Sequence, residues 1–167
     1  MDSRSVRRRI VREKVMQALY AHEITKDGVD HVVKHILVGL EDNKDAHAFA
    51  KDLVAATIEH TVDIDKVIRT KVANWDFKRI ALIDRLILRM AICELLYFKD
   101  IPPKVTMNEA IELAKLFSTE RSGYFVNGIL DAVQEDLKIS GDLSKVGRGL
   151  FDGAGPRVNK SKSTKTS

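Results

Sequence analysis

Apolar residues recur along most of this chain at the three- and four-residue spacing of helical faces, and no segment supports a strand. This spacing predicts helices over about residues 4–24 and 29–38, and from about 45 to 68 with a break. Further helices are predicted over about 77–98, from 106 to 117 and over 124–137. The helix over 77–98 is apolar on most sides, so it should be the central element. The pattern therefore predicts an all-α domain of six or seven helices.

Local signals place several of the helix ends. Asp76 precedes the central helix, where a carboxylate accepts hydrogen bonds from free N–H groups. Thr106 followed by Glu109 matches a capping box, which predicts a helix start at that point. Residues 118–123 are expected to form a short connection before the last helix.

The composition changes after residue 139. Glycine, serine, lysine and threonine dominate residues 140–167, which predicts a basic and mostly disordered tail after a folded domain over 1–139. Residues 4–14 hold six Lys/Arg against one Glu, and residues 138–167 hold seven Lys/Arg against two Asp. The net charge is +4, so the middle of the chain is acidic. Basic ends on an acidic body favour a localised anionic partner, with nucleic acid as the first candidate.

Three features of the sequence bear on the cellular location of the protein. Cys93 is the single cysteine among the 167 residues, so no intrachain disulfide forms and a reducing, cytoplasmic location is expected. The Arg-rich start lacks the apolar stretch of a secretory signal. No apolar run reaches the ~18 residues of a membrane span, and no membrane partner is expected.

The chain offers little chemistry for catalysis. His31 and His35 have the i, i+4 spacing of two zinc ligands, but no third ligand lies at a typical distance, and an exposed surface pair is the alternative. No glycine-rich phosphate loop follows a strand. Cys93 lies in the most apolar helix, where packing is its expected role. We therefore expect no enzyme activity, no metal and no cofactor.

The first helix is more informative. One strip beside the apolar face holds Arg9, Arg12, Met16 and Tyr20, with Arg8 nearer to that face and Arg7 on the other side of the strip. Guanidinium groups bind phosphates with paired hydrogen bonds, and an aromatic ring stacks on unpaired bases. The strip favours single-stranded RNA over duplex. A solvated basic helix end with a half-buried Tyr20 is the alternative.

The last predicted helix has a related feature. Its core register leaves Phe125 about 100° from the core face and Tyr124 on the far side. Arg121 precedes both residues, and a free helix start attracts anions. A second RNA-facing region is expected here, with a core role for Phe125 as the alternative.

Four segments resemble the signatures of a known family. Residues 103–115 (PKVTMNEAIELAK) resemble the PxKVxINEAIELAK motif of the NusB family of bacterial transcription antitermination factors, and residues 125–131 (FVNGILD) resemble its FVNGVLD motif. Residues 8–20 resemble its Arg-rich opening, and residues 84–95 resemble its central helix. The matches span about residues 7–137 in the family's order.

The resemblance implies a fold and a set of partners. The fold would be two small helical bundles packed together. The function would be binding of boxA-type single-stranded RNA in leader and ribosomal RNA transcripts, together with the small-subunit ribosomal protein called NusE. RNA polymerase and other Nus factors would be indirect partners, so the protein would modify elongation and termination, notably on ribosomal RNA operons.

The resemblance also implies roles for individual residues. The acidic position that opens the central motif, Asp84, would face the protein partner. Cys93 stands where an aromatic is common, and Arg121 stands where some members have an acidic residue, which should strengthen RNA binding. The residues expected on the RNA side are Arg7, Arg8, Arg9, Arg12, Gln17, Tyr20, Arg121, Tyr124 and Phe125.

Three other functions compete with this interpretation. The main alternative is a protein–protein adaptor that kept the fold and lost RNA binding, against which the arginines and Tyr20 argue. A NusB-like domain of an RNA methyltransferase is disfavoured because no methyltransferase domain is expected within 167 residues. A metal-dependent helical enzyme is the remaining alternative.

Overall fold

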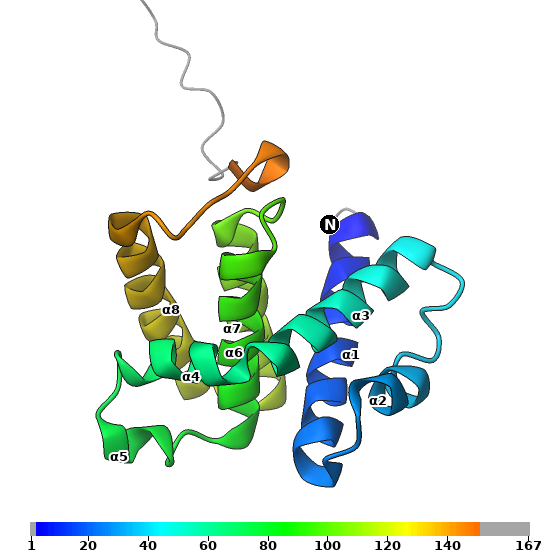
Figure 1. The fold of residues 1–167 in the computed structure, drawn as a ribbon, viewed down its shortest axis with the longest axis horizontal. Helices are drawn as coiled ribbons and strands as arrows, with labels where there is room; N and C mark the ends of the chain where they lie inside the picture. Colours follow the sequence, from blue (N-terminus) through cyan, green and yellow to red (C-terminus); the bar gives the residue numbers. More distant parts are fainter. Residues whose placement is uncertain (1–2, 151–167) are drawn as a thin grey trace, which may run out of the picture.

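The computed structural model describes the backbone of residues 3–150 and the side chains of residues 8–73 and 76–150. Figure 1 shows two groups of helices joined where α3 leads into α4. The first group consists of α1 (Ser3–Thr25), α2 (Val29–Ile36) and α3 (Lys44–Glu59). The second consists of α4 (Thr61–Arg69), the one-turn α5 (Asn74–Phe77), α6 (Leu82–Tyr97), α7 (Pro103–Phe117) and α8 (Glu120–Ser140). The described part thus contains seven helices longer than one turn and no strand, which confirms the predicted all-α fold.

Helix α6 is the centre of the molecule, as its sequence predicts. Eleven of its sixteen residues are buried, and it packs against α1, α3, α4, α7 and α8. Such a helix has no polar stripe wide enough to face water, so its burial requires neighbours on every side. The two bundles share one continuous core because α6 belongs to the second bundle and also contacts the first.

Two of the predicted helix starts are wrong. Helix α6 begins at Leu82 and has no side-chain cap, because Asp76 lies inside the separate one-turn helix α5. Helix α7 begins at Pro103, where proline is favoured because its missing N–H has no helical partner to lose. Thr106 therefore lies inside α7, and the predicted capping box does not form. Its hydroxyl donates instead to Glu94 Oε1 at 3.2 Å.

The last helix is longer than predicted. Helix α8 begins at Glu120, and the side chain of Thr119 accepts a hydrogen bond from the Ser122 N–H. Most of the expected connection over 118–123 is thus helical. As a consequence, Tyr124 and Phe125 lie one turn inside the helix and not at its free start.

The segment after α8 folds back onto the second bundle. Helix α8 ends at Gly141, whose φ of 80° is the left-handed conformation that glycine adopts at low cost. The Val146 N–H donates to Lys99 O at 3.0 Å, and a 3₁₀ turn (Gly147–Leu150) follows. The first residues of the expected tail, as far as residue 150, thus have a defined place in the fold. The rest of the predicted tail, 151–167, lies outside the described residues.

A buried ion pair connects the two bundles. Arg12 on α1 donates to both oxygens of Glu94 on α6, at 2.9 and 2.7 Å, and each side chain is 1% exposed. Two paired hydrogen bonds are the strong, directional form of an Arg–carboxylate contact. In addition, Arg89 of α6 pairs with Asp65 on α4 and approaches Glu23 on α1 at 3.6 Å. The relative orientation of α1 and α6 depends on these contacts.

Arg12→Met should lower the free energy of unfolding by about 3–5 kcal/mol, because Glu94 would stay buried without its partner. Urea denaturation measures this loss. Arg9→Met, at an ion pair whose arginine is 30% exposed, serves as the control and should cost about 1 kcal/mol or less. The double variant Arg12→Met/Glu94→Leu should recover much of the loss. Equal losses in Arg12→Met and Arg9→Met would contradict the assigned role of the buried pair.

Candidate nucleic-acid interface

The exposed face of α1 carries part of the expected set. Arg8 and Gln17 are exposed, and Tyr20 is 43% exposed. Arg8 forms no hydrogen bond or ion pair with another described residue, so its guanidinium is available to an anion. The side chain of Arg7 lies outside the described residues.

Arg12 does not belong to this surface. It is buried against Glu94, and its guanidinium carbon lies 5.4 Å from the centre of the Phe49 ring. A phosphate would reach it only after the Glu94 pair breaks, so Arg12, unlike the expected RNA contact, is not accessible to RNA in this conformation. Met16, on the same strip, is also buried. The second bundle covers this side of α1, which the periodicity of α1 alone does not reveal.

Arg9 is partly engaged within the protein. Its Nε and Nη2 atoms donate to the two carboxylate oxygens of Glu109 on α7, at 3.0 and 3.2 Å. The hydrogen bonds to Glu109, opposed by burial and reinforced by the charges of Glu109, Glu112 and Glu13, raise the pKa of Arg9. An incoming phosphate must therefore compete with Glu109 for this guanidinium.

Helix α8 presents two aromatic rings near its first turn. Tyr124 is 78% exposed and Phe125 is 38% exposed, while Val126 is fully buried. Arg121 is exposed in the same turn. Flat, accessible rings are the side chains that stack on unpaired bases. The structure thus leaves both rings accessible, as their position outside the core register predicts.

The α1 and α8 regions lie apart in the fold. Figure 1 shows α1 and α8 running in opposite directions with α6 and α7 between them. The first turn of α8 lies at the same end of the molecule as the end of α1, and the start of α1 lies at the opposite end. Glu109 and Glu112 of the intervening α7 are close enough to act on Arg9. The basic and aromatic regions therefore do not form one continuous basic surface.

Asp84 lies inside the protein. It is 6% exposed, its Oδ2 accepts a 2.9 Å hydrogen bond from the Ser122 hydroxyl, and its Oδ1 is buried. This contact joins the first turn of α6 to the first turn of α8. A direct, exposed contact of Asp84 with a protein partner does not fit this position, because its carboxylate is covered by the chain itself.

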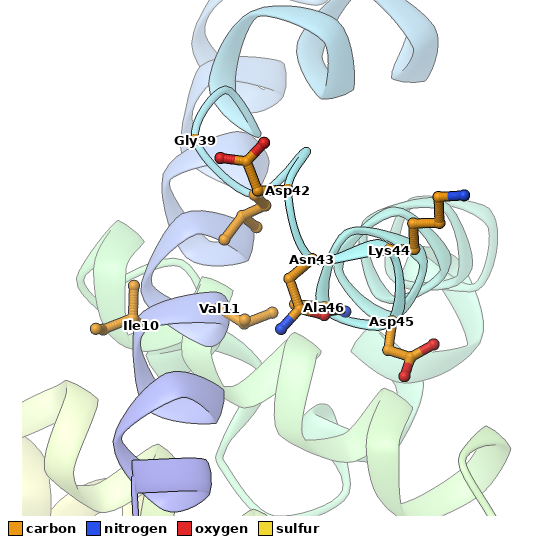
Figure 2. Close-up of a pocket in the computed structure, with 9 residues that line it drawn as sticks. Ile10, Val11, Gly39, Asp42, Asn43, Lys44, Asp45 and Ala46 are labelled. Carbon is orange, nitrogen blue, oxygen red and sulfur yellow. Dashed lines mark hydrogen bonds between the residues drawn. The ribbon is translucent and has the colours of Figure 1, made fainter.

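No catalytic centre is visible in the described part of the chain. A cavity of about 480 Å³ opens between α1 and the start of α3 (Figure 2), and Asn43, Asp42 and Asp45 line it. Asn43 is committed to capping α3 through the Ala46 N–H. His31 and His35 are an exposed pair with ring centres 4.4 Å apart. Among residues with described side chains, no three His, Cys, Asp or Glu gather as metal ligands would.

None of the described helices combines the length and the apolar character that crossing a bilayer requires.

Family membership follows from comparison with known proteins. Residues 9–135 match the model of the NusB family. The chain belongs to the NusB family. The transcription antitermination protein NusB of Chloroherpeton thalassium is 46% identical over 151 residues, which cover 88% of this chain and 70% of that protein. The protein of the same name from Salinibacter ruber is 48% identical over 146 residues, covering 86% and 91%.

Solved structures show the same relation. A NusB structure from T. maritima superposes with a TM-score of 0.72 at 38% identity, covering 77% of this chain and 91% of that one. A structure of antitermination factors NusB and NusE in complex with double-stranded RNA gives 0.69 at 26% identity, covering 80% and 98%. The arrangement of two helical bundles is therefore the fold of this family, as the sequence motifs predict.

Cys93 should not react with a thiol reagent in the native protein. Burial, opposed by a hydrogen bond with Thr57, raises the pKa of its thiol to about 12, so almost no thiolate exists at pH 8. Titration with Ellman's reagent should show no fast-reacting thiol before denaturation and one afterwards. A fast native reaction would show that α6 opens, or that Cys93 is a nucleophile after all.

Proposed function

We propose that this protein is an RNA-binding transcription antitermination factor that acts with a ribosomal protein partner and performs no catalysis. The observation that carries the proposal is the family match over residues 9–135, because the relatives are named as transcription antitermination proteins. Its expected place of action is the cytoplasm. There it modifies elongation and termination by RNA polymerase, notably on ribosomal RNA operons, together with other Nus factors.

The proposed RNA is a boxA-type single strand. The exposed guanidinium of Arg8 suits a phosphate, and the exposed rings of Tyr20, Tyr124 and Phe125 suit unpaired bases. Base stacking needs bases that are not already paired, which favours a single strand. The related NusB–NusE structure contains double-stranded RNA, so a duplex belongs in every binding experiment.

The proposed protein partner is the small-subunit ribosomal protein NusE, which accompanies NusB in the related structure. We place its contact at the end of the molecule where the first turns of α6 and α8 meet. Asp84 then acts as a positioning residue, since its bond to Ser122 holds these turns together. RNA polymerase would be reached through the assembled complex.

A protein–protein adaptor without RNA binding is the second candidate. The internal pairing of Arg9 and Arg12 favours it, because two of the expected RNA contacts are already neutralised by Glu109 and Glu94. An adaptor would bind the ribosomal protein with no measurable affinity for boxA-type or scrambled RNA.

Arginine and aromatic substitutions should differ in their salt dependence. Arg8→Ala should weaken binding of matched and scrambled RNA alike and reduce the slope of log K against log salt by about 0.7. Tyr124→Ala and Phe125→Ala should each cost about 1–3 kcal/mol of binding with little change in slope. Fluorescence anisotropy across KCl concentrations measures both quantities. A Phe125→Ala protein that melts far lower yet binds RNA normally when folded would remove Phe125 from the RNA surface.

Glu109→Gln should strengthen RNA binding, because it releases the Arg9 guanidinium from a charged partner. Glu112→Gln is a matched control, since it removes the same charge from α7 without breaking a hydrogen bond to Arg9. The expected order of affinity in the same anisotropy assay is Glu109→Gln, then Glu112→Gln, then the unaltered protein. Equal affinities for all three would show that Arg9 does not contact RNA.

A further inference from the structure

The segment after α8 is held on the end of α6 by specific contacts. Lys145 Nζ donates to the carbonyl oxygens of Glu94 and Phe98, at 3.0 and 2.8 Å. These carbonyls lie at the C-terminal end of α6, where the helix dipole favours a cation, and Lys145 adds a second hydrogen bond to each of them. Burial lowers the pKa of Lys145, and the charges of Glu94 and Asp100 oppose that shift. We call residues 141–150 the C-terminal arm.

Gly149 shows how closely the arm fits. It is buried, and a Cβ atom at this position would lie 1.9 Å from the carbonyl oxygen of Lys99. The obstacle is backbone, which cannot turn aside as a flexible side chain would. Only glycine permits this approach, so the arm rests on the α6–α7 loop in a defined position.

The docked arm places Arg148 near the start of α1. Arg148 and Arg8 line the same cavity of about 260 Å³, together with Asp100, Pro102 and Val105. Both arginines are exposed, and neither forms an ion pair with another described residue. Two free guanidinium groups against one carboxylate give this cavity a net positive charge, which suits a phosphate group.

The surroundings of this cavity are also basic. A second cavity, of about 620 Å³, borders the arm and is lined by Lys104, Lys138 and Lys145, with no acidic residue among its lining. Both cavities thus border the arm and the start of α7, and cations line both of them. Figure 1 shows the arm (orange) at the end of the molecule where α1 begins. The net charge of this end is positive, in contrast to the α1–α7 contact, where the carboxylates of Glu109 and Glu112 act on Arg9.

We propose that the C-terminal arm is part of the RNA-binding surface, where Arg148 and Arg8 together bind the phosphate backbone of the RNA. The inference rests on the proposed function and extends the RNA path from α1 across the start of α7. The RNA backbone is the occupant that fits, because the surface is continuous with Arg8 and its charge is complementary to phosphate. An acidic protein segment is the competing occupant that the experiment separates.

The test is the binding of a fluorescein-labelled boxA-type single-stranded RNA to full-length variants across KCl concentrations. Arg148→Ala should weaken binding roughly three- to tenfold at low salt and reduce the salt slope by about 0.7. Arg148→Lys should keep the slope and lose only the paired hydrogen bonds. Asp100→Asn should strengthen binding, because it removes the one carboxylate of the cavity.

A second variant tests whether RNA binding requires the docked position of the arm as well as the charge of Arg148. Gly149→Ala should displace the arm from Lys99 and weaken RNA binding as much as Arg148→Ala does. The double variant should then be no weaker than either single variant. Gly28→Ala is the control, since a Cβ there meets nothing within 4 Å. Hydrogen exchange should show faster exchange of the Val146 N–H in Gly149→Ala alone.

Lys51→Ala, at an exposed position of α3, controls for general loss of charge and should bind as the unaltered protein does. If Arg8→Ala weakens RNA binding while Arg148→Ala and Asp100→Asn leave it unchanged, the inference fails and the proposed function stands. If Arg148→Ala weakens only the ribosomal protein's binding, the arm contacts protein and the inference also fails. If the unaltered protein binds no RNA, both the proposed function and the inference are wrong.

Discussion

The buried pair of Arg12 and Glu94 is the contact on which the rest of the structure depends. Two ions lose their hydration inside the core, and only paired hydrogen bonds offset that cost. Thr106 adds a third bond to the carboxylate, so α1, α6 and α7 meet at one point. Arg12 Nη1 is buried without a hydrogen-bond partner among the described residues. The pair therefore contributes more to the relative orientation of the bundles than to net stability.

That orientation decides which cations of α1 remain available. With α6 and α7 covering one side of the helix, Arg12 is buried and Arg9 faces Glu109. Arg8 and Tyr20 remain on the open side, about 18 Å apart along the axis. The affinity of this face for an anion consequently depends on how many guanidinium groups have no acidic partner within the protein. A count of arginines in the sequence overestimates the number of these free groups.

Contacts at the two ends of α6 position the segments that carry the proposed binding surfaces. Lys145 binds the last carbonyls of α6 and thereby seats the C-terminal arm. At the opposite end of α6, Asp84 accepts from Ser122 and holds the first turn of α8, which directly precedes Tyr124 and Phe125. Both contacts join segments far apart in the chain to the central helix. The surfaces proposed for RNA and for a protein partner are thus both supported by α6.

The sequence alone determined the fold class, the central position of α6 and the family, because helical periodicity and four local motifs are properties of neighbouring residues. It also indicated correctly that Tyr124 and Phe125 lie outside the core register. Only the tertiary structure decided the positions of Arg12, Asp84 and the C-terminal arm. The burial of Arg12 depends on Glu94, 82 residues away, and the seat of the arm depends on backbone carbonyls of α6. Such partners come together only when the helices pack, so no local pattern in the chain records them.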